Sequence, residues 1–241
     1  MNGSPFKITL SPGKTAEFLG KIIVFLIVAH LSTHWLEGAP KHTFAAWLAP
    51  IFNLDVEGNV PTFFSVCLWM LNAALFFLIW KTRRSQQGWS AIWLILSVLF
   101  CYLAFDELTC IHEEATPFIR SILGTSGFLS FAWVIPYGLG CILLAVFFIP
   151  MVWRMDPKIL LWFAAAAITF AAGSIGLEMC EGRYLDHHPG DIGYFWLMTL
   201  EESLEMIGLA MLAYASLRVM EVECEAVSIH LPGARNNSRS T

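Results

Sequence analysis

The segment 194–218, YFWLMTLEESLEMIGLAMLAYASLR, is an apolar run interrupted by three glutamates, Glu201, Glu202 and Glu205. Because a transmembrane helix needs about 20 mostly apolar residues, this segment predicts a membrane span. At about 1.5 Å per residue, Glu205 falls roughly 13–15 Å beyond Trp196, which is hydrocarbon depth. A glutamate at that depth must be protonated, paired with a cation or bound to a metal. Ionisable groups inside a span are therefore functional candidates.

The composition of the whole chain agrees with a membrane protein. The chain has 241 residues, of which 57% are hydrophobic and 14% are charged, and its mean hydropathy is +0.64. Soluble domains carry about 25% charged residues. The length suits one compact bundle with short connections. A net charge of −5 and the lack of a basic patch or an aromatic RNA motif exclude nucleic acid as a partner.

Six segments are long and apolar enough to be membrane spans. They are 17–37, 62–80, 89–112, 129–153, 159–180 and 194–218. In the longest connection, 39–61, the apolar stretch 43–52 predicts a short amphipathic helix at the membrane interface. The predicted fold is all-α: a six-helix transmembrane bundle with a short interfacial helix in the first outer loop. It forms a single domain, 1–222, and the polar tail, 223–241, is predicted to be a disordered cytoplasmic segment.

Lysine and arginine are distributed unevenly between the two faces of this bundle. With six spans both termini share one face, which collects most of the 14 basic residues: Lys7, Lys14, Lys21, Lys81, Arg83, Arg84, Arg154, Lys158, Arg218, Arg235 and Arg239. The opposite face has Lys41, Arg120 and Arg183. Because cytoplasmic loops are enriched in basic residues, both termini are predicted to be cytoplasmic. The other face is then periplasmic or extracellular.

Acidic residues and histidines show the reverse distribution. Fourteen of the 19 Asp and Glu residues, and six of the seven histidines, fall on the outer side or in the outer halves of spans. The rule for basic residues does not require this, because acids contribute little to topology. We interpret the bias as one polar, metal-binding site near the outer face. The candidate metal ligands are His30, His34, Asp106, Glu107, His112, Glu113, Glu178, Glu181, Glu201, Glu202 and Glu205.

The ends of the first and fifth spans supply paired candidates. His30 and His34 are four residues apart and share a helix face, so both imidazoles could reach one ion. The alternative for this pair is a polar helix end that bonds to its neighbours. Glu178 and Glu181 are neighbours at i, i+3, and Arg183 could instead neutralise Glu181 in a structural ion pair.

The end of the third span carries acids at helical spacing. Asp106 and Glu113 are seven residues apart, close to two turns, and so share one face of a continuous helix. Glu107 and Glu114 share the next face, and His112 points elsewhere unless the helix loosens near its end. A solvated helix end explains Glu114 well. It fits Asp106 less well, because apolar residues surround Asp106 in the sequence.

Other polar groups near the outer face have a weaker case as ligands. His187 and His188 lie in a loop and are expected to be solvated. The six cysteines form no C-x-x-C pair, so neither a zinc ribbon nor a thioredoxin-like site is indicated. Cys110 and Cys180 lie near outer helix ends, and the sequence leaves a disulfide between them open.

A site of carboxylates and imidazoles without thiolates suits a divalent transition metal: iron, zinc or manganese. The spacing matches neither the zincin H-E-x-x-H nor the Glu-x-x-His repeat of ferritin-like proteins. In an enzyme the metal would activate water or dioxygen, as in a hydrolase or an oxidoreductase acting on a lipid or apolar substrate. Two alternatives stay open: a proton or cation transporter, and a non-catalytic subunit whose acids pair with basic residues of other membrane subunits.

Three motifs carry a resemblance to a known family: the run 52–65, FNLDVEGNVPTFFS, the pattern Asp106-Glu107-x4-His112-Glu113, and Glu201-Glu202-x2-Glu205. Together they resemble a family of uncharacterised bacterial multi-pass integral membrane proteins, over most of the chain. The resemblance implies a bacterial inner (plasma) membrane location and brings no known function. It also implies that the 52–65 loop belongs with the site, so that Asp55, Glu57 and Asn59 cap it from outside. The alternative is that Asp55 and Asn59 only turn or cap the chain before the second span.

Overall fold

The computed structural model describes residues 10–34, 43–83, 90–152, 155–188 and 191–223, which form helices and turns with no strand. The elements are α1 (Pro12–His34), α2 (Phe44–Phe52), α3 (Val60–Arg83), α4 (Ser90–Thr109), α5 (Ile111–Leu123), the 3-10 turn η1 (Gly127–Leu129), α6 (Val134–Val152), α7 (Pro157–Ala171), the π-helical segment η2 (Ala172–Leu177), α8 (Glu178–Leu185) and α9 (Ile192–Glu223). The predicted all-α class is confirmed. The predicted tail lies outside the described residues from position 224 onward, whereas Glu223 belongs to α9.

Five stretches of helix are long and apolar enough to cross a membrane. They are Pro12–His34, Val60–Arg83, Ser90–Thr109, Pro157–Leu185 and Ile192–Val222, and they correspond to five of the six predicted spans. The other predicted span, 129–153, corresponds to α6, whose apolar part, Val134–Ile149, is shorter. The count of six therefore stays a prediction. So does the interfacial position of α2, although α2 forms where the sequence predicts a helix.

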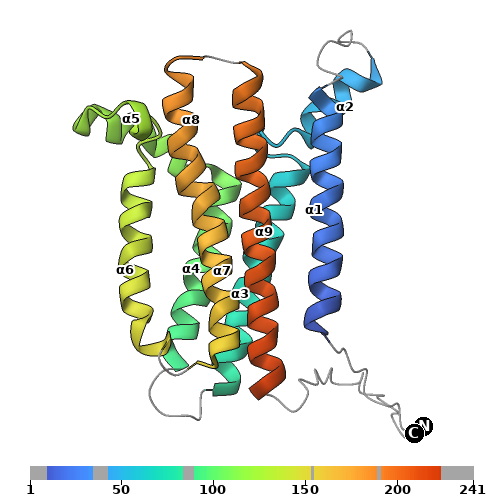
Figure 1. Cartoon of the computed structure of the whole chain (residues 1–241), viewed down its shortest axis with the longest axis vertical. Coiled ribbons are helices and arrows are strands. Elements are labelled where there is room, and N and C mark those ends of the chain that lie inside the picture. Colours follow the sequence, from blue (N-terminus) through green and yellow to red (C-terminus); the bar gives the residue numbers. More distant parts are fainter. Residues whose placement is uncertain (1–9, 35–42, 84–89, 153–154, 189–190, 224–241) are drawn as a thin grey trace, which may run out of the picture.

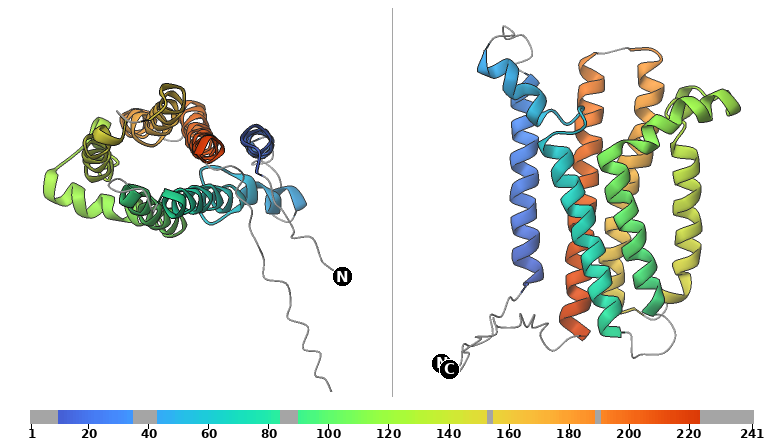
Figure 2. Two further views of the ribbon diagram at one scale, coloured as in Figure 1. Left: turned by 90° about the horizontal axis from the view of Figure 1, so that it is seen from below. Right: turned by 180° about the vertical axis from the view of Figure 1, so that it is seen from behind.

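The long helices run side by side, and α9 lies at the centre of the packing (Figure 1). α9 packs against α1, α3 and α7, while α3 packs against α4. The end-on view in Figure 2 shows α6 standing apart from these packed helices. α2, α5 and the outer end of α8 gather at one end of the bundle, and α1 begins and α9 ends at the other (Figure 1). We call these the outer end and the cytoplasmic end, after the predicted orientation.

Two glycines let α9 approach α7 and η2 closely. A Cβ atom at Gly173 would lie 2.9 Å from the carbonyl oxygen of Glu201. A Cβ atom at Gly208 would lie 2.8 Å from the backbone nitrogen of Phe170. Small residues permit such backbone contact between membrane helices, where dispersion packing replaces the hydrophobic effect. The close approach fixes the acidic part of α9 against α8.

The cytoplasmic half of the bundle has an apolar core. Phe76 and Trp93 are each 1% exposed, and Phe76 also packs edge-on against Phe100 with ring centroids 4.9 Å apart. The few buried polar side chains bond to helix carbonyls. Ser97 Oγ donates to the carbonyl of Ala73 at 2.8 Å, and Asn72 Nδ2 donates to that of Leu209 at 3.0 Å.

The predicted third span, 89–112, is wrong at its outer end. α4 ends at Thr109, and Cys110 takes the left-handed conformation with φ +54°, which no other described non-glycine residue adopts. A left-handed residue terminates a helix, and α5 then leaves sideways (Figure 1). The predicted shared faces, Asp106 with Glu113 and Glu107 with Glu114, are therefore wrong, because the two members of each pair lie on different helices.

Candidate metal centre

A cavity of about 220 Å³ lies in the outer half, between α3, α4, α6, α8 and α9 and beneath the loop that follows α2. Ten carboxyl groups line it: Asp55, Glu57, Asp106, Glu107, Glu113, Glu178, Glu181, Glu201, Glu202 and Glu205. His112 lines it as well, and no lysine or arginine does. Nine of the eleven candidate ligands thus share one cavity, while their role as metal ligands stays a prediction.

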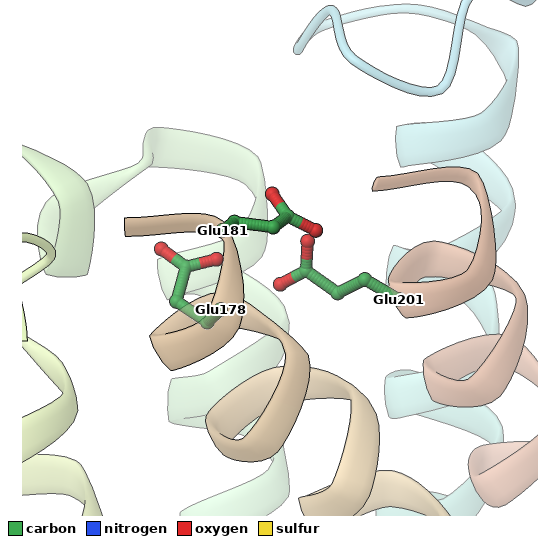
Figure 3. A group of neighbouring side chains, drawn as sticks. All are labelled: Glu178, Glu181 and Glu201. Atoms are coloured by element: carbon green, nitrogen blue, oxygen red, sulfur yellow. The ribbon is translucent and has the colours of Figure 1, made fainter. Parts of the chain in front are cut away.

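Three of these carboxylates form the tightest cluster, which we call the glutamate trio. Glu178 and Glu181 come from α8 and Glu201 from α9, and one oxygen atom of each lies within 4.8 Å of the others (Figure 3). The indole N–H of Trp133 donates to Oε1 of Glu178 at 2.9 Å. Glu181 is 2% exposed, and its Oε1 atom is buried without a hydrogen-bond partner. A buried acceptor of this kind is costly unless something binds it.

The ion pair considered for Glu181 is not formed. Among the described residues, no salt bridge joins Arg183 to Glu178 or Glu181, and the Arg183 side chain packs beside Gly127 instead. The π-helical segment η2 immediately precedes the trio. Its i→i+5 bonds change the angular position of the residues that follow, and such segments are frequent at functional sites. Glu178 and Glu181 are thereby set at an angle that a continuous α-helix would not give.

Asp106 and His112 form a second arrangement at the same cavity. The left-handed turn at Cys110 folds α5 back, so that His112 Nδ1 lies 2.9 Å from Oδ2 of Asp106. The backbone N–H of His112 donates to the other carboxylate oxygen at 3.2 Å. The imidazole also packs edge-on against the ring of Trp133, with centroids 4.7 Å apart. The sequence expected His112 to point elsewhere unless the helix loosened, and the break at Cys110 instead brings His112 to Asp106.

His30 and His34 lie outside the cavity. His30 is fully buried, and its Nδ1 atom accepts from the backbone N–H of Leu54 at 3.0 Å. Nε2 therefore carries the proton and donates to the hydroxyl of Thr199 at 2.9 Å. The ring of His34 packs at a tilt against that of Phe195, with ring centroids 4.3 Å apart. This arrangement agrees with the alternative interpretation, a polar helix end bonded to its neighbours.

The loop after α2 covers the outer mouth of the cavity, as the resemblance implied. The hydroxyl of Tyr194 donates to Asp55 at 3.0 Å, which ties the loop to α9. Glu57 accepts from the hydroxyl of Thr62 at 3.1 Å. Burial raises the pKa of the Glu57 carboxyl, and the bond from Thr62 offsets part of the rise. Asn59 instead follows the alternative interpretation, because its side chain caps α3 by accepting from the backbone N–H of Thr62.

Aromatic donors are the part of the site that the sequence did not reveal. Trp133 donates a hydrogen bond to the trio, and Trp69 lines the cavity with a buried indole nitrogen beside Glu107. Tyr137 also lines the cavity, and its hydroxyl lies 3.2 Å from that of Tyr102. The chain has ten tryptophans, and nothing in their spacing distinguishes these two.

The remaining polar candidates lie where the sequence placed them. His187 and His188 are exposed, and His188 stacks on Tyr184. Cys110 and Cys180 are both free, so the disulfide left open by the sequence is not formed. Burial raises the pKa of the Cys110 thiol to about 11, which keeps it protonated at neutral pH.

A bundle of helices with five membrane-length apolar stretches and an acidic cavity in one half defines a class, that of helical proteins with helices apolar enough to cross a membrane and a buried carboxylate cluster. Within that class the chain belongs to the family described as Domain of unknown function (DUF8692), whose profile matches residues 19–219. The family without a known function, predicted from the three motifs, is thereby confirmed. No curated protein and no solved structure matches the chain.

Proposed function

We propose that this chain is a membrane metalloprotein that binds a divalent transition metal ion at the glutamate trio, near the outer face. The observation that carries the proposal is the convergence of three carboxylate oxygens within 4.8 Å, together with a buried Oε1 atom of Glu181 that has no hydrogen-bond partner. Three carboxylates held this closely repel one another unless protons or a metal cation neutralise them. Among the residues that the structure describes, no lysine or arginine lines the cavity.

The proposed topology has six spans, with α6 as the shortest, in a bacterial inner membrane and with cytoplasmic termini. Basic residues support this orientation, because those of the described residues at the cytoplasmic end are Lys14, Lys21, Lys81, Arg83, Lys158 and Arg218. α2 then lies at the outer interface, where its exposed Phe44 and Trp47 would enter the headgroup region. In this topology the lipid bilayer surrounds the whole helical bundle.

The cavity supports chemistry on part of an apolar substrate. Leu103, Phe170 and Met198 form apolar patches of a wall that otherwise carries carboxylates. Its volume of about 220 Å³ is below the roughly 300–1,000 Å³ of typical small-molecule sites. The cavity therefore suits metal-bound water or dioxygen and the reacting part of a lipid, rather than a whole lipid. A metal ion there would activate the oxygen species, as in a hydrolase or an oxidoreductase.

A transporter fits the arrangement less well. Passage would need polar groups on the cytoplasmic side of the cavity. The buried Asn72, Ser97 and Ser216 there bond to helix carbonyls in the same half. A non-catalytic subunit is the other alternative, and it predicts that the acids are neutralised by a partner that copurifies.

The test is elemental analysis of the full chain after purification in a mild detergent. We expect a stoichiometric transition metal in the wild type, loss of that metal in Glu181→Gln, and a large reduction in Glu205→Gln. Glu114→Gln is the matched control, because Glu114 is exposed on α5 and does not line the cavity. A wild type that neither contains nor binds iron, manganese or zinc would overturn the proposal.

A further inference from the structure

The Asp106–His112 pair has the geometry of an imidazole that is prepared to bind a metal. Asp106 is buried and holds His112 at two points, the ring Nδ1 and the backbone N–H. Because the carboxylate accepts from Nδ1–H, the lone pair of the ring is on Nε2. Metal-bound histidines usually donate their other nitrogen to a carboxylate in this way, which fixes the tautomer and the ring orientation.

The backbone between Asp106 and His112 has an unusual conformation, and this conformation also places His112 beside Asp106. Cys110 has φ +54°, a region that costs of order 1 kcal/mol or more for a residue with a side chain. If Cys110 were helical, α4 would continue and carry His112 away from Asp106. Sparsely populated conformations persist where the surrounding structure imposes them, and they cluster at functional sites.

His112 lies next to the glutamate trio but does not belong to it. Trp133 contacts both, because its ring packs against His112 and its N–H donates to Glu178. The set of ligand atoms within 4.8 Å of one another contains the three glutamates and not His112. A single ion centred on the trio would therefore leave the imidazole without a role.

The cavity also contains groups that one ion does not satisfy. One divalent cation at the trio leaves seven further carboxyl groups around the same 220 Å³, and among the described residues the lining contains His112 but no lysine or arginine. Glu113, in the first turn of α5, also lines the cavity. The buried Trp69 indole N–H lies beside Glu107 and lines the same cavity.

We infer that the cavity holds a second metal ion, bound through Nε2 of His112, with Glu113 as an oxygen ligand and Asp106 as the residue that positions the imidazole. This inference rests on the proposed function, because the second ion shares its cavity with the first. An imidazole ligand favours iron, zinc or manganese over calcium and magnesium, which prefer oxygen ligands alone. The site is thus a dinuclear transition-metal centre with one nitrogen ligand.

The experiment uses the full chain in detergent, stripped with a chelator and reloaded with Mn²⁺ as the probe. Bound Mn²⁺ is counted by elemental analysis, and nitrogen ligation is detected by pulsed electron paramagnetic resonance. We expect two ions in the wild type and one in each of Glu181→Gln and His112→Gln. The ion left in Glu181→Gln shows nitrogen coupling, and the ion left in His112→Gln does not.

Two further variants separate ligation from structure. Asp106→Asn keeps the histidine but loses its orientation, and it should weaken the nitrogen-coupled ion about 10- to 100-fold. His188→Gln is the matched control, because His188 is exposed and outside the cavity, and it keeps both ions. Size-exclusion elution as a single species shows that each variant is folded.

The outcomes distinguish this inference from the proposed function. A single Mn²⁺ that is lost in Glu181→Gln and unaffected by His112→Gln overturns the second ion and leaves the proposed function intact. A residual ion in Glu181→Gln without nitrogen coupling overturns the role of His112. A wild type that binds neither Mn²⁺ nor iron nor zinc overturns both.

Discussion

The outer and cytoplasmic halves of this bundle are built from the same long helices but have opposite interiors. The outer half encloses ten carboxyl groups around a cavity, whereas the cytoplasmic half is filled by side chains such as Phe76, Trp93 and Leu217. α9 shows the contrast within one helix, with Glu201 in the first half and Leu217 in the second. The difference indicates that the two halves have different roles. The packed half holds the helices together, and the outer half can therefore keep groups that repel one another.

The largest expected effect tests the packed half. Phe76→Ala should lower the free energy of unfolding by about 3–5 kcal/mol, because Phe76 is fully buried and its removal leaves a cavity. The number of bound metal ions should not change. Unfolding in a denaturing detergent gives the stability, and elemental analysis gives the metal content.

Phe77→Ala is the control for that prediction, because its neighbour Phe77 is 42% exposed on the outside of the bundle. It should cost clearly less than Phe76→Ala. Equal losses for the two variants would show that the cytoplasmic half is not the source of stability.

The next effect tests the charged half. Metal at about 100 times its dissociation constant should stabilise the wild type by ~2.7 kcal/mol, because it binds the folded state only. Glu181→Gln should lose the part of this stabilisation that comes from the ion at the glutamate trio. Its metal-free form should be at least as stable as the metal-free wild type, because one of ten crowded carboxyl groups is removed. Thermal unfolding with and without Mn²⁺ measures both, with Glu114→Gln as the control.

A third prediction separates the buried His30 from the partly buried His112 by role. His30→Ala removes the acceptor for Leu54 and the donor to Thr199, so it should lower stability by about 2 kcal/mol, at roughly 1 kcal/mol for each bond. Metal content should stay at the wild-type value. His112→Gln should show the reverse pattern. A loss of metal in His30→Ala with unchanged stability would contradict this assignment.

The smallest effect concerns pH. Burial raises the pKa of Glu57 from 4.5, so its contribution to folding is fully present below about pH 4.5 and is lost as pH rises through the folded pKa. The metal-free protein should therefore unfold at a lower temperature at pH 8 than at pH 5, and Glu57→Gln should flatten this slope. Bound metal displaces the protons and should also reduce the slope. A slope that is identical in Glu57→Gln and the wild type would exclude Glu57 as a contributor.

The sequence predicted the helices well because their signals are local. Apolar length placed the spans, and the spacing of Glu201 and Glu205 along α9 gave their depth. The break at Cys110 was missed, because no glycine or proline marks it and a cysteine in the left-handed conformation is unusual. That single backbone angle changed the partners of Asp106, Glu113 and His112.

The sequence by itself determined that this chain is helical, that several helices are long and apolar enough to cross a membrane, and that its acids gather toward one end. Only the tertiary structure decided which acids meet and which histidine faces the cavity. His30 bonds to Thr199, 169 positions away, and Trp133 bonds to Glu178, 45 positions away. Helical periodicity specifies which residues share a face of one helix. It carries no information on which faces of different helices come together, because that depends on close contacts such as the one at Gly173.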